Sequence, residues 1–400
     1  MEKSYYNELM ELNKDYINTF EALYRLNTSD NGKIEELFQR IKIHLIETKL
    51  FTPTEIIKSI KYAAQFNIRY IGSYMILLKI FLQEYPKTYD SLIILFQHIL
   101  IGKIPIESAY VELVFDYHYN HYASDKNGEI FIVKMIMNDD IKAFVSFIES
   151  EYAENDYKLN LASYRFYQYC CYYGAVNCFR FLRTKLKCKN DLSGFPRECL
   201  NYSFIGGNPD IISECLKWYK PNNVCMSYAI ATHNIDFVTF LMNEYNLIIE
   251  IADCMIYNNL QAFLVYLDKL NDINKCVAES VHFNIMSLCE FFILHGADIN
   301  GKGEEGSSAF IIAAKENKLN FVNLLISHGA DVNFKNGYGT TALHYAIQNN
   351  NINMVETLIS HGADVNAKNS YGQTPFEYSN DEIIMNFLKS HGAKSNLKIK

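Results

Sequence analysis

Apolar residues in the last quarter of the chain form stripes of helical period, separated by polar turns. Six apolar positions belong to two successive stripes: Leu343, Ala346, Ile347, Val355, Leu358 and Ile359. Their spacing places them on one face of two consecutive helices. Thr341 and Asn351 stand where the two helices would be N-capped, and Gly362 follows the second, where a left-handed residue is needed. The pattern predicts a helix pair followed by a polar turn from Asp364 to Gly372.

The same pattern returns at a fixed period. The motif His-Gly-Ala-Asp begins at His295, His328 and His361, so successive copies are 33 residues apart. The seven residues SHGADVN at 327–333 recur unchanged at 360–366. Two helices of about eight residues cannot bury both of their faces alone, so neighbouring units must stack. The period therefore predicts a solenoid of stacked helix pairs.

A shorter unit precedes the regular one. Four asparagines open outer-helix patterns upstream as expected N-caps, at spacings of 26, 25 and 25 residues: Asn208, Asn234, Asn259 and Asn284. Asp140 and Ala175 begin earlier members of the series, and Asp381 begins the last. A unit of 25 residues has room for two helices and a turn, but for no long connection. We expect about nine helix pairs in total.

These motifs resemble the ankyrin repeat over about residues 297–400. The resemblance rests on three aligned openings, GSSAF at Gly306, GTTALH at Gly339 and GQTPFE at Gly372, together with the GADVN close. It implies an all-α ankyrin-repeat solenoid, in which each helix pair carries a hairpin finger projecting at right angles. The shorter upstream units resemble the divergent segment, without assigned function, that precedes regular repeats in a large protist ankyrin group.

The first 125 residues show helical patterns without the repeat. One stripe comprises Ile34, Leu37, Phe38, Ile41 and Leu45. Thr52 and Glu55 form a capping box that opens another helix. We expect an N-terminal all-helical domain at residues 1–125 that covers the first helix pair. Finger-poor, ankyrin-like pairs would follow at 126–297, and regular repeats with a C-terminal cap at 298–400.

Composition narrows the kinds of partner and the compartment. The net charge of −8 and the pI near 5.8, without a basic block, argue against nucleic acid. The most apolar run, Leu92–Ile106, is too short to span a bilayer and predicts a buried helix rather than membrane insertion. The ten cysteines contain no CxxC pair, and the N-terminus lacks the apolar core of a signal peptide. Reduced thiols and a cytoplasmic location are therefore expected.

The sequence offers little catalytic chemistry. The recurring histidines would lie one repeat apart, at ~10 Å, too far to share a metal ion whose bonds are ~2 Å long. We expect them to be loop residues bonded to neighbouring backbone, and His344 to have a structural role in the capping motif. Asp298, Asp331 and Asp364 form a ladder rather than an acid–base pair. Gly301-Lys302-Gly303 lacks the spacing of a phosphate loop. We predict that the protein is not an enzyme and needs neither metal nor cofactor.

The tyrosine-rich stretch 164–173 leaves two alternatives open. In the first, Phe166, Tyr169 and Tyr173 belong to the core at helical spacing. In the second, Tyr167 or Tyr172 faces outward and anchors a partner, because tyrosine supplies a large contact area with few rotamers.

The resemblance implies a partner-binding surface made of finger tips and inner helices. The candidate residues are Lys302, Glu304, Phe334, Lys335, Tyr338, Lys368 and Tyr371 on the fingers, and Tyr345 and Gln348 on an inner helix. The alternative for the aromatic ones is that each packs on its own hairpin. The chain is thus predicted to be a protein–protein interaction scaffold with a protein partner of unidentified kind. The alternative is an adaptor that recruits a substrate to an enzyme complex, such as a ubiquitin ligase, through its N-terminal helices.

Overall fold

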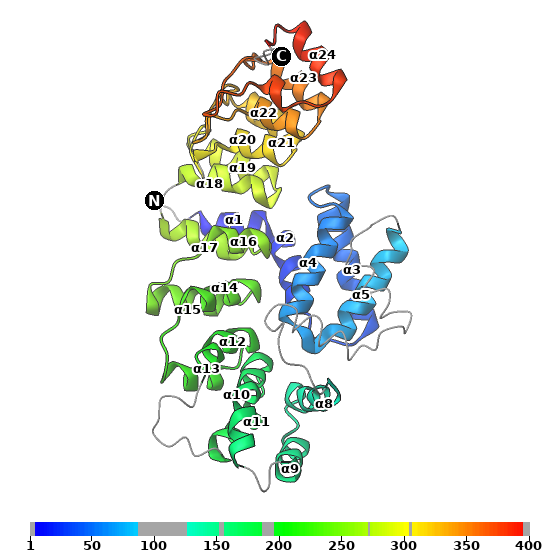
Figure 1. The fold of residues 1–400 in the computed structure, drawn as a ribbon, viewed down its shortest axis with the longest axis vertical. Helices are drawn as coiled ribbons and strands as arrows, with labels where there is room; N and C mark the ends of the chain where they lie inside the picture. The colour runs from blue at the N-terminus through cyan, green and yellow to red at the C-terminus, as the bar shows by residue number, and fades with distance from the viewer. Residues whose placement is uncertain are drawn as a thin grey trace, which may run out of the picture. The chain divides into compact units, whose positions relative to one another are not determined.

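The computed structural model describes residues 5–86, 126–151, 156–185, 196–270, 273–303 and 306–394, and within these ranges it shows helices and no strands (Figure 1). The expected all-α class is confirmed. The chain forms two compact units, one of residues 10–265 and one of residues 1–9 with 266–400. The division at residues 125 and 297 stays a prediction. The helix expected at Leu92–Ile106 lies outside the described residues.

A cluster of helices forms the N-terminal part of the larger unit. Its members are α2 (Lys14–Tyr24), α3 (Asn31–Ile41), the π-helical turn η1 (Lys42–Glu47), α4 (Pro53–Phe66), η2 (Ile68–Tyr70) and α5 (Ile71–Glu84), after α1 (Tyr6–Leu12) at the start of the chain. The predicted stripe from Ile34 to Leu45 is buried. The capping box is present, because the Thr52 N–H donates to the Glu55 carboxylate at 2.7 Å and the Glu55 N–H donates to Thr52 Oγ1 at 3.3 Å.

Nine helix pairs follow along the described chain, as expected. The five upstream pairs, here called the divergent array, are α8 (Lys126–Met137) with α9 (Ile141–Glu151), α10 (Asp156–Tyr173) with α11 (Val176–Lys185), α12 (Glu198–Gly206) with α13 (Pro209–Leu216), α14 (Asn223–Ala231) with α15 (Ile235–Tyr245), and α16 (Ile251–Ile256) with α17 (Leu260–Leu270). The four downstream pairs, here called the regular repeats, are α18 (Ile273–Ser280) with α19 (Met286–Leu294), α20 (Ala309–Lys315) with α21 (Leu319–Ser327), α22 (Ala342–Gln348) with α23 (Ile352–Ser360), and η6 (Pro375–Tyr378) with α24 (Glu382–Ser390).

Eight of these pairs turn from the inner to the outer helix through one left-handed residue. The eight are Asp139, Gly174, Gly207, His233, Asn258, Asn284, Asn317 and Asn350, with φ between 49° and 67°. The next residue caps the outer helix, as Asn208 and Asn234 do through their side chains. The prediction that Asn284 is such a cap is wrong, because Ile285 takes that place. Asparagine suits both the left-handed turn position and the N-cap position that follows it. The sequence alone therefore does not show which of the two an asparagine occupies.

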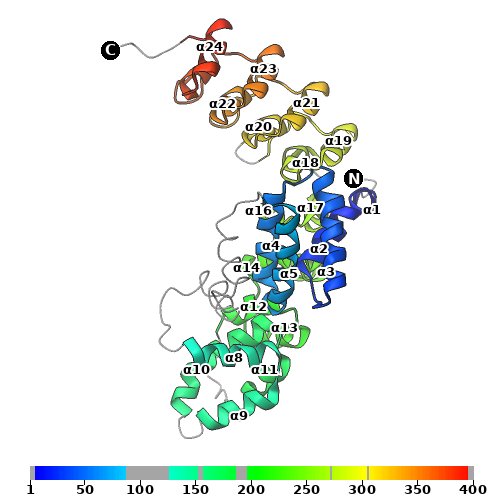
Figure 2. The same cartoon turned by 90° about the vertical axis from the view of Figure 1, so that its right-hand side faces the viewer.

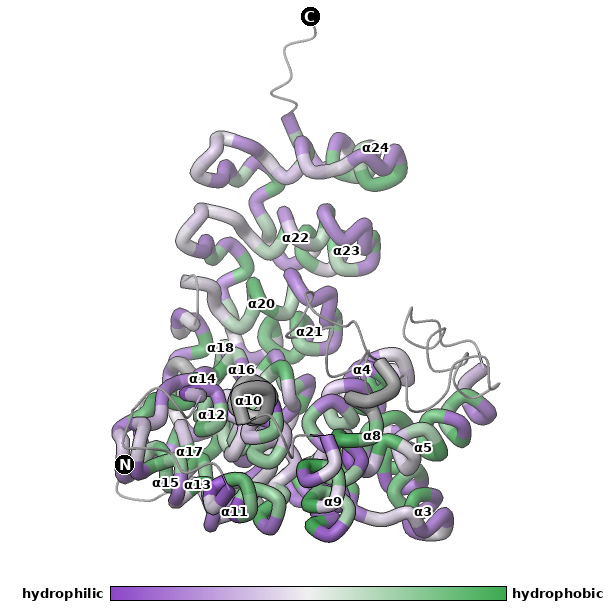
Figure 3. Tube along the Cα trace, turned by 60° about the horizontal axis from the view of Figure 1, so that its bottom comes forward, coloured by the Kyte–Doolittle hydropathy of each residue, from purple (hydrophilic) through white to green (hydrophobic). Residues whose placement is uncertain are grey.

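The connections between pairs separate the two kinds of repeat. Six residues (217–222) join α13 to α14, and five (246–250) join α15 to α16. Fourteen residues stand at each of the corresponding places in the regular repeats, at 295–308, 328–341 and 361–374. The connections before α14 and α16 are therefore too short for a finger of this length. In Figure 3 the regular repeats carry apolar colour on their helices and mainly hydrophilic colour on these long connections.

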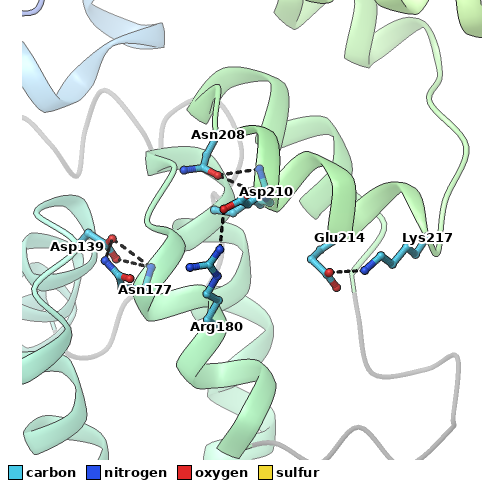
Figure 4. Close-up of polar contacts among 8 residues, drawn as sticks. Asp139, Asn177, Arg180, Asn208, Asp210, Glu214 and Lys217 are labelled. Carbon is cyan, nitrogen blue, oxygen red and sulfur yellow. Dashed lines mark hydrogen bonds and ion pairs between the residues drawn. The ribbon is translucent and has the colours of Figure 1, made fainter.

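Polar contacts link neighbouring pairs in the divergent array (Figure 4). The Asp139 carboxylate accepts hydrogen bonds from the N–H groups of Asn177 and Cys178 at 3.1 and 3.0 Å, and so caps α11 from the preceding pair. Arg180 on α11 donates to Asp210 on α13 at 2.6 Å. Both side chains of that ion pair are more than half exposed, so it contributes only about 0–1 kcal/mol. The cap from Asp139 links the two pairs more specifically than this ion pair does, because it accepts hydrogen bonds from N–H groups at the start of α11 that have no partner within the helix.

Candidate protein-binding surface

In each of the last two fingers, at 328–341 and 361–374, one asparagine fixes the conformation of the loop. The Asn336 N–H donates to the Thr340 carbonyl at 3.1 Å. Its Oδ1 accepts the N–H groups of Tyr338 at 3.0 Å and Thr340 at 2.9 Å. Asn369 makes the same three bonds one repeat later. The tyrosine at each tip is therefore carried on a loop that these three hydrogen bonds hold.

A second asparagine ties each finger to the next and explains the unchanged motif. Asn333 Oδ1 accepts the Asp364 N–H at 2.7 Å, and its Nδ2 donates to the Gly362 carbonyl at 2.9 Å. Asn366 forms both bonds with the following unit, at 2.8 and 3.0 Å, and Asn300 forms the first at 2.9 Å. The glycines that follow the outer helices have φ near +85°, as expected for left-handed ends. The asparagine of SHGADVN thus bonds to the following unit, and the aspartate N–H bonds to the asparagine of the unit before.

The loop histidines have the structural role that was expected. Three of them donate from Nδ1–H to the backbone carbonyl four residues earlier, at 2.7–2.9 Å: His295, His361 and His391. Among the residues that the structure describes, no group of histidine, cysteine, aspartate and glutamate could hold a metal ion.

His344 is buried and bridges two repeats. Its Nδ1 accepts the Thr341 N–H at 3.2 Å and lies 2.9 Å from Thr341 Oγ1. Its Nε2–H donates to the Gln373 carbonyl of the next finger at 3.3 Å. Burial lowers the pKa of His344, so the neutral ring that these bonds require is the stable form at neutral pH. The hydrogen bonds of His344 therefore hold neighbouring repeats together.

Most of the predicted binding residues lie on the surface of the fingers. Tyr338 is 49% exposed and Tyr371 is 77% exposed. Four further candidates are exposed: Lys302, Lys335, Gln348 and Lys368. Phe334 and Tyr345 are half-buried, and the Tyr345 phenol accepts a bond from Asn336 Nδ2 at 3.3 Å. Tyr345 therefore braces its own finger. Glu304 lies outside the described residues.

Most of the tyrosine-rich stretch faces inward, although Tyr164 is 39% exposed. Tyr167 is fully buried with its ring 5.5 Å from that of Phe179, so the alternative in which it faces outward is wrong. Tyr172 is half-buried, and its hydroxyl donates to the Gln65 carbonyl at the end of α4. Tyr172 does anchor a partner, but this partner is a helix of the same chain.

A row of tyrosines on the inner helices of the divergent array continues from Tyr172. The rings of Tyr172 and Tyr202 are 6.0 Å apart, and those of Tyr202 and Tyr228 are 6.3 Å apart. Phe66 of α4 packs on Tyr228 at 6.0 Å and on Tyr257 at 5.3 Å. In both views α4 lies beside the ends of α14 and α16 (Figures 1 and 2). The sequence reading missed this row, whose only signal is a tyrosine every 26 to 30 residues.

Polar and stacking contacts close the same interface. Arg69 donates to the Tyr173 carbonyl at 2.6 Å, and Asn258 donates to Ser59 at 3.1 Å. Tyr24 of α2 stacks on His233 with 4.3 Å between ring centroids. The expectation that the N-terminal domain covers the first pair stays a prediction, because residues 87–125 of that domain lie outside the described residues. These contacts reach the second, fourth and fifth pairs, where inner-helix tyrosines provide the apolar surface.

A stack of helix pairs with long fingers is a repeat solenoid, the class that the fold defines. Residues 277–369 match the family model "Ankyrin repeats (3 copies)", so this segment consists of ankyrin repeats. Residues 192–266 match the model of a domain of unknown function, DUF3447, which lies in the divergent array. No curated protein matches the chain. Ankyrin repeats indicate protein–protein interaction. Among the described helices none is long and apolar enough to cross a membrane.

Proposed function

We propose that the protein is a non-catalytic interaction scaffold that binds a partner protein through the fingers of its regular repeats. One contrast carries this proposal. The chain's own helices cover the inner-helix tyrosines of the divergent array, whereas Tyr338 and Tyr371 are exposed on the fingers. Tyrosines on a rigid support are the side chains on which binding energy concentrates.

The described cysteines support the non-catalytic reading. All nine are buried free thiols. Burial raises the pKa of Cys225 and of Cys289 to about 11, so neither is a thiolate at neutral pH. Free thiols also fit the cytoplasmic location that we propose for the protein.

The experiment has two stages. Cross-linking to the full chain followed by mass spectrometry identifies a partner, whose affinity is then measured for the double variant Tyr338→Ala, Tyr371→Ala. We expect affinity to fall by about tenfold or more, since truncated aromatic anchors typically cost above 1 kcal/mol each. The control is Ile248→Ala with Ile256→Ala, two exposed apolar side chains in the divergent array. Unchanged affinity in the tyrosine variant would refute the proposal.

An adaptor remains the second candidate. It would recruit a substrate to an enzyme complex such as a ubiquitin ligase, and the observation that favours it is exposed apolar surface on the N-terminal helices. Leu12 is 51% exposed and Ile43 is 50% exposed. The test is Ile43→Glu in the full chain, because deleting the N-terminal helices would uncover the inner tyrosines and create artificial binding. Loss of an enzyme complex in this variant, with partner binding at the fingers intact, would establish the adaptor.

A further inference from the structure

The three described connections of the regular repeats carry a lysine at the same position. This lysine lies two residues after the asparagine that ties one finger to the next. The three lysines, all exposed, are Lys302, Lys335 and Lys368. Lys335 Nζ donates to the Lys368 carbonyl at 3.1 Å, so the ammonium group is held over the neighbouring finger. The bonds between asparagines and backbone fix the fingers one repeat apart. The lysines therefore form a row of fixed spacing.

These lysines have no carboxylate partner in the part of the chain that the structure describes. The ion pairs found in residues 273–303 and 306–394 instead involve His282, Lys318 and His328. Glu304 and Glu305 follow Lys302 closely in the sequence and lie outside the described residues. In the other two units the nearest acidic residues are Asp331 and Asp364, four positions before a lysine. Their Oδ1 atoms accept the N–H groups two residues ahead at 2.9 Å, so these carboxylates are turned onto their own loop.

Aromatic side chains run beside the lysines. Tyr338 and Tyr371 each follow a lysine by three residues, and the Ser370 N–H donates to the Tyr338 carbonyl at 2.9 Å between the two fingers. A Cβ on Gly339 would come within 3.0 Å of the Ser370 nitrogen, so adjacent fingers touch at their backbones. Positive charge and apolar rings thus lie on one rigid, closely packed edge of a protein whose net charge is −8.

We propose that this edge binds an extended acidic segment of the partner protein, running along the fingers from repeat to repeat. This inference rests on the proposed function and specifies its partner. Stacked helices lie ~8–10 Å apart, and an extended chain in the polyproline II form advances ~3.1 Å per residue, so three residues span one repeat. This form has three residues per turn, so every third side chain points to the same side. The expected motif has an acidic residue at every third position, with apolar or aromatic residues between them against the tyrosines. The charge complementarity is local, since an acidic segment is repelled by the protein's overall charge.

The test uses the full chain and fluorescein-labelled peptides in a fluorescence anisotropy titration. The probe is Glu-Pro-Thr-Glu-Pro-Thr-Glu, whose prolines favour the polyproline II form. A peptide of the same composition with its glutamates adjacent, Glu-Glu-Glu-Pro-Thr-Pro-Thr, isolates the spacing. We expect the first peptide to bind several-fold more tightly than the second, and its affinity to fall as salt rises from 50 to 300 mM.

The variant that tests the row is Lys302→Gln, Lys335→Gln, Lys368→Gln. We expect it to weaken binding of the spaced peptide roughly tenfold, from three contacts of modest size each. The control changes three exposed lysines of the other compact unit: Lys58→Gln, Lys79→Gln, Lys220→Gln. The same thermal unfolding for both variants shows that the fold is kept.

Four outcomes would overturn the inference. They are equal affinity for both peptides, full affinity in the finger variant, no peptide binding, and equally tight binding of a single-stranded oligonucleotide of the same charge. In each case the cross-linked partner still tests the proposed function separately. If its affinity still depends on Tyr338 and Tyr371, the scaffold stands and only the acidic motif fails.

Discussion

Tyr228 in the divergent array and Tyr345 in the regular repeats occupy the same place in their helix pairs. Each lies six residues before the asparagine that caps the outer helix, Asn234 or Asn351. Tyr228 is covered by Phe66 of an N-terminal helix, whereas Tyr345 is bonded to the finger of its own repeat.

The difference shows that a helix pair of this kind needs a cover on its inner side. Where the connection has fourteen residues, the chain folds a finger there, and the finger tip is left for other molecules. Where it has six or five, before α14 and α16, Phe66 of α4 packs on Tyr228 and Tyr257 instead. The surface that we propose for a partner therefore lies in the regular repeats.

The largest expected loss of stability comes from a substitution in the N-terminal helices that cover the divergent array. Tyr24→Ala removes a ring that is 2% exposed and stacks on His233, so the compact unit of residues 10–265 should lose ~3–5 kcal/mol. Trp218 is the chain's single tryptophan and lies in that unit, so its fluorescence follows this unfolding in denaturant. Tyr24→Phe is the control, because the Tyr24 hydroxyl is buried without a hydrogen-bond partner. A similar loss in both variants would contradict the stacking role of the ring.

A core substitution in the regular repeats should leave that signal unchanged. Leu358 is fully buried in α23, and Leu358→Ala should cost ~2–5 kcal/mol through lost burial and the cavity that remains. The loss should be greatest in the C-terminal units, since repeats are stabilised by their neighbours. Circular dichroism should show early unfolding while the Trp218 transition stays in place. Leu241→Ala, at a fully buried position of α15, should shift the Trp218 transition instead.

Acid should weaken the divergent array through His233. Burial lowers the pKa of His233 to about 4, below the value of about 6.5 in an unfolded chain. The folded state then binds fewer protons, so this contribution to stability is present above about pH 6.5. It is lost as pH falls towards 4, by up to ~1.4 kcal/mol per pH unit.

The matched variant for this prediction is His233→Asn. Asparagine holds the same left-handed turn position in four other pairs, so the backbone is preserved while the titrating ring is removed. The slope of the Trp218 unfolding free energy between pH 6.5 and 4 should become flatter in the variant. An unchanged slope would assign the pH dependence to other groups.

Substitutions at two glycines should separate two causes of lost stability, the strain of a left-handed backbone and the clash of a side chain with a neighbouring backbone. Gly329 has φ of +85° and open space where a Cβ would lie, so Gly329→Val should cost ~1–2 kcal/mol through backbone strain alone. Gly329→Asn should recover much of that loss in denaturant unfolding, because asparagine tolerates this conformation. Gly206 differs, since a Cβ there would lie 2.1 Å from the Cys171 carbonyl oxygen. Gly206→Ala should therefore destabilise its unit more than Gly329→Ala does.

The smallest effect concerns the finger tips. Tyr338→Ala and Tyr371→Ala should each change the free energy of unfolding by no more than ~0.5 kcal/mol, because both rings are exposed. Thermal unfolding measures this in the same samples that are used for partner affinity. Early unfolding of the double variant would mean that the rings support the fingers, and would remove them from the proposed surface.

Local chemistry made much of this fold predictable from the sequence. The period, the capping asparagines, the glycines after the outer helices and the short connections before α14 and α16 depend on residues close together in the chain. Each motif determines the backbone conformation around it, because a capping side chain or a left-handed residue acts within one turn of the helix. The one local error, at Asn284, arose where asparagine serves two adjacent roles.

Only the tertiary structure decided which surfaces are covered. Tyr172 bonds to Gln65, Arg69 to Tyr173 and Asn258 to Ser59, between residues 107, 104 and 199 positions apart. No helical period predicts such contacts, because burial depends on what packs on a face as well as on the face itself. The same reasoning applies to the proposed site. The sequence indicated exposed tyrosines on the fingers, whereas the bond from Asn336 to Tyr345 and the unpaired lysine row followed from how the repeats stack.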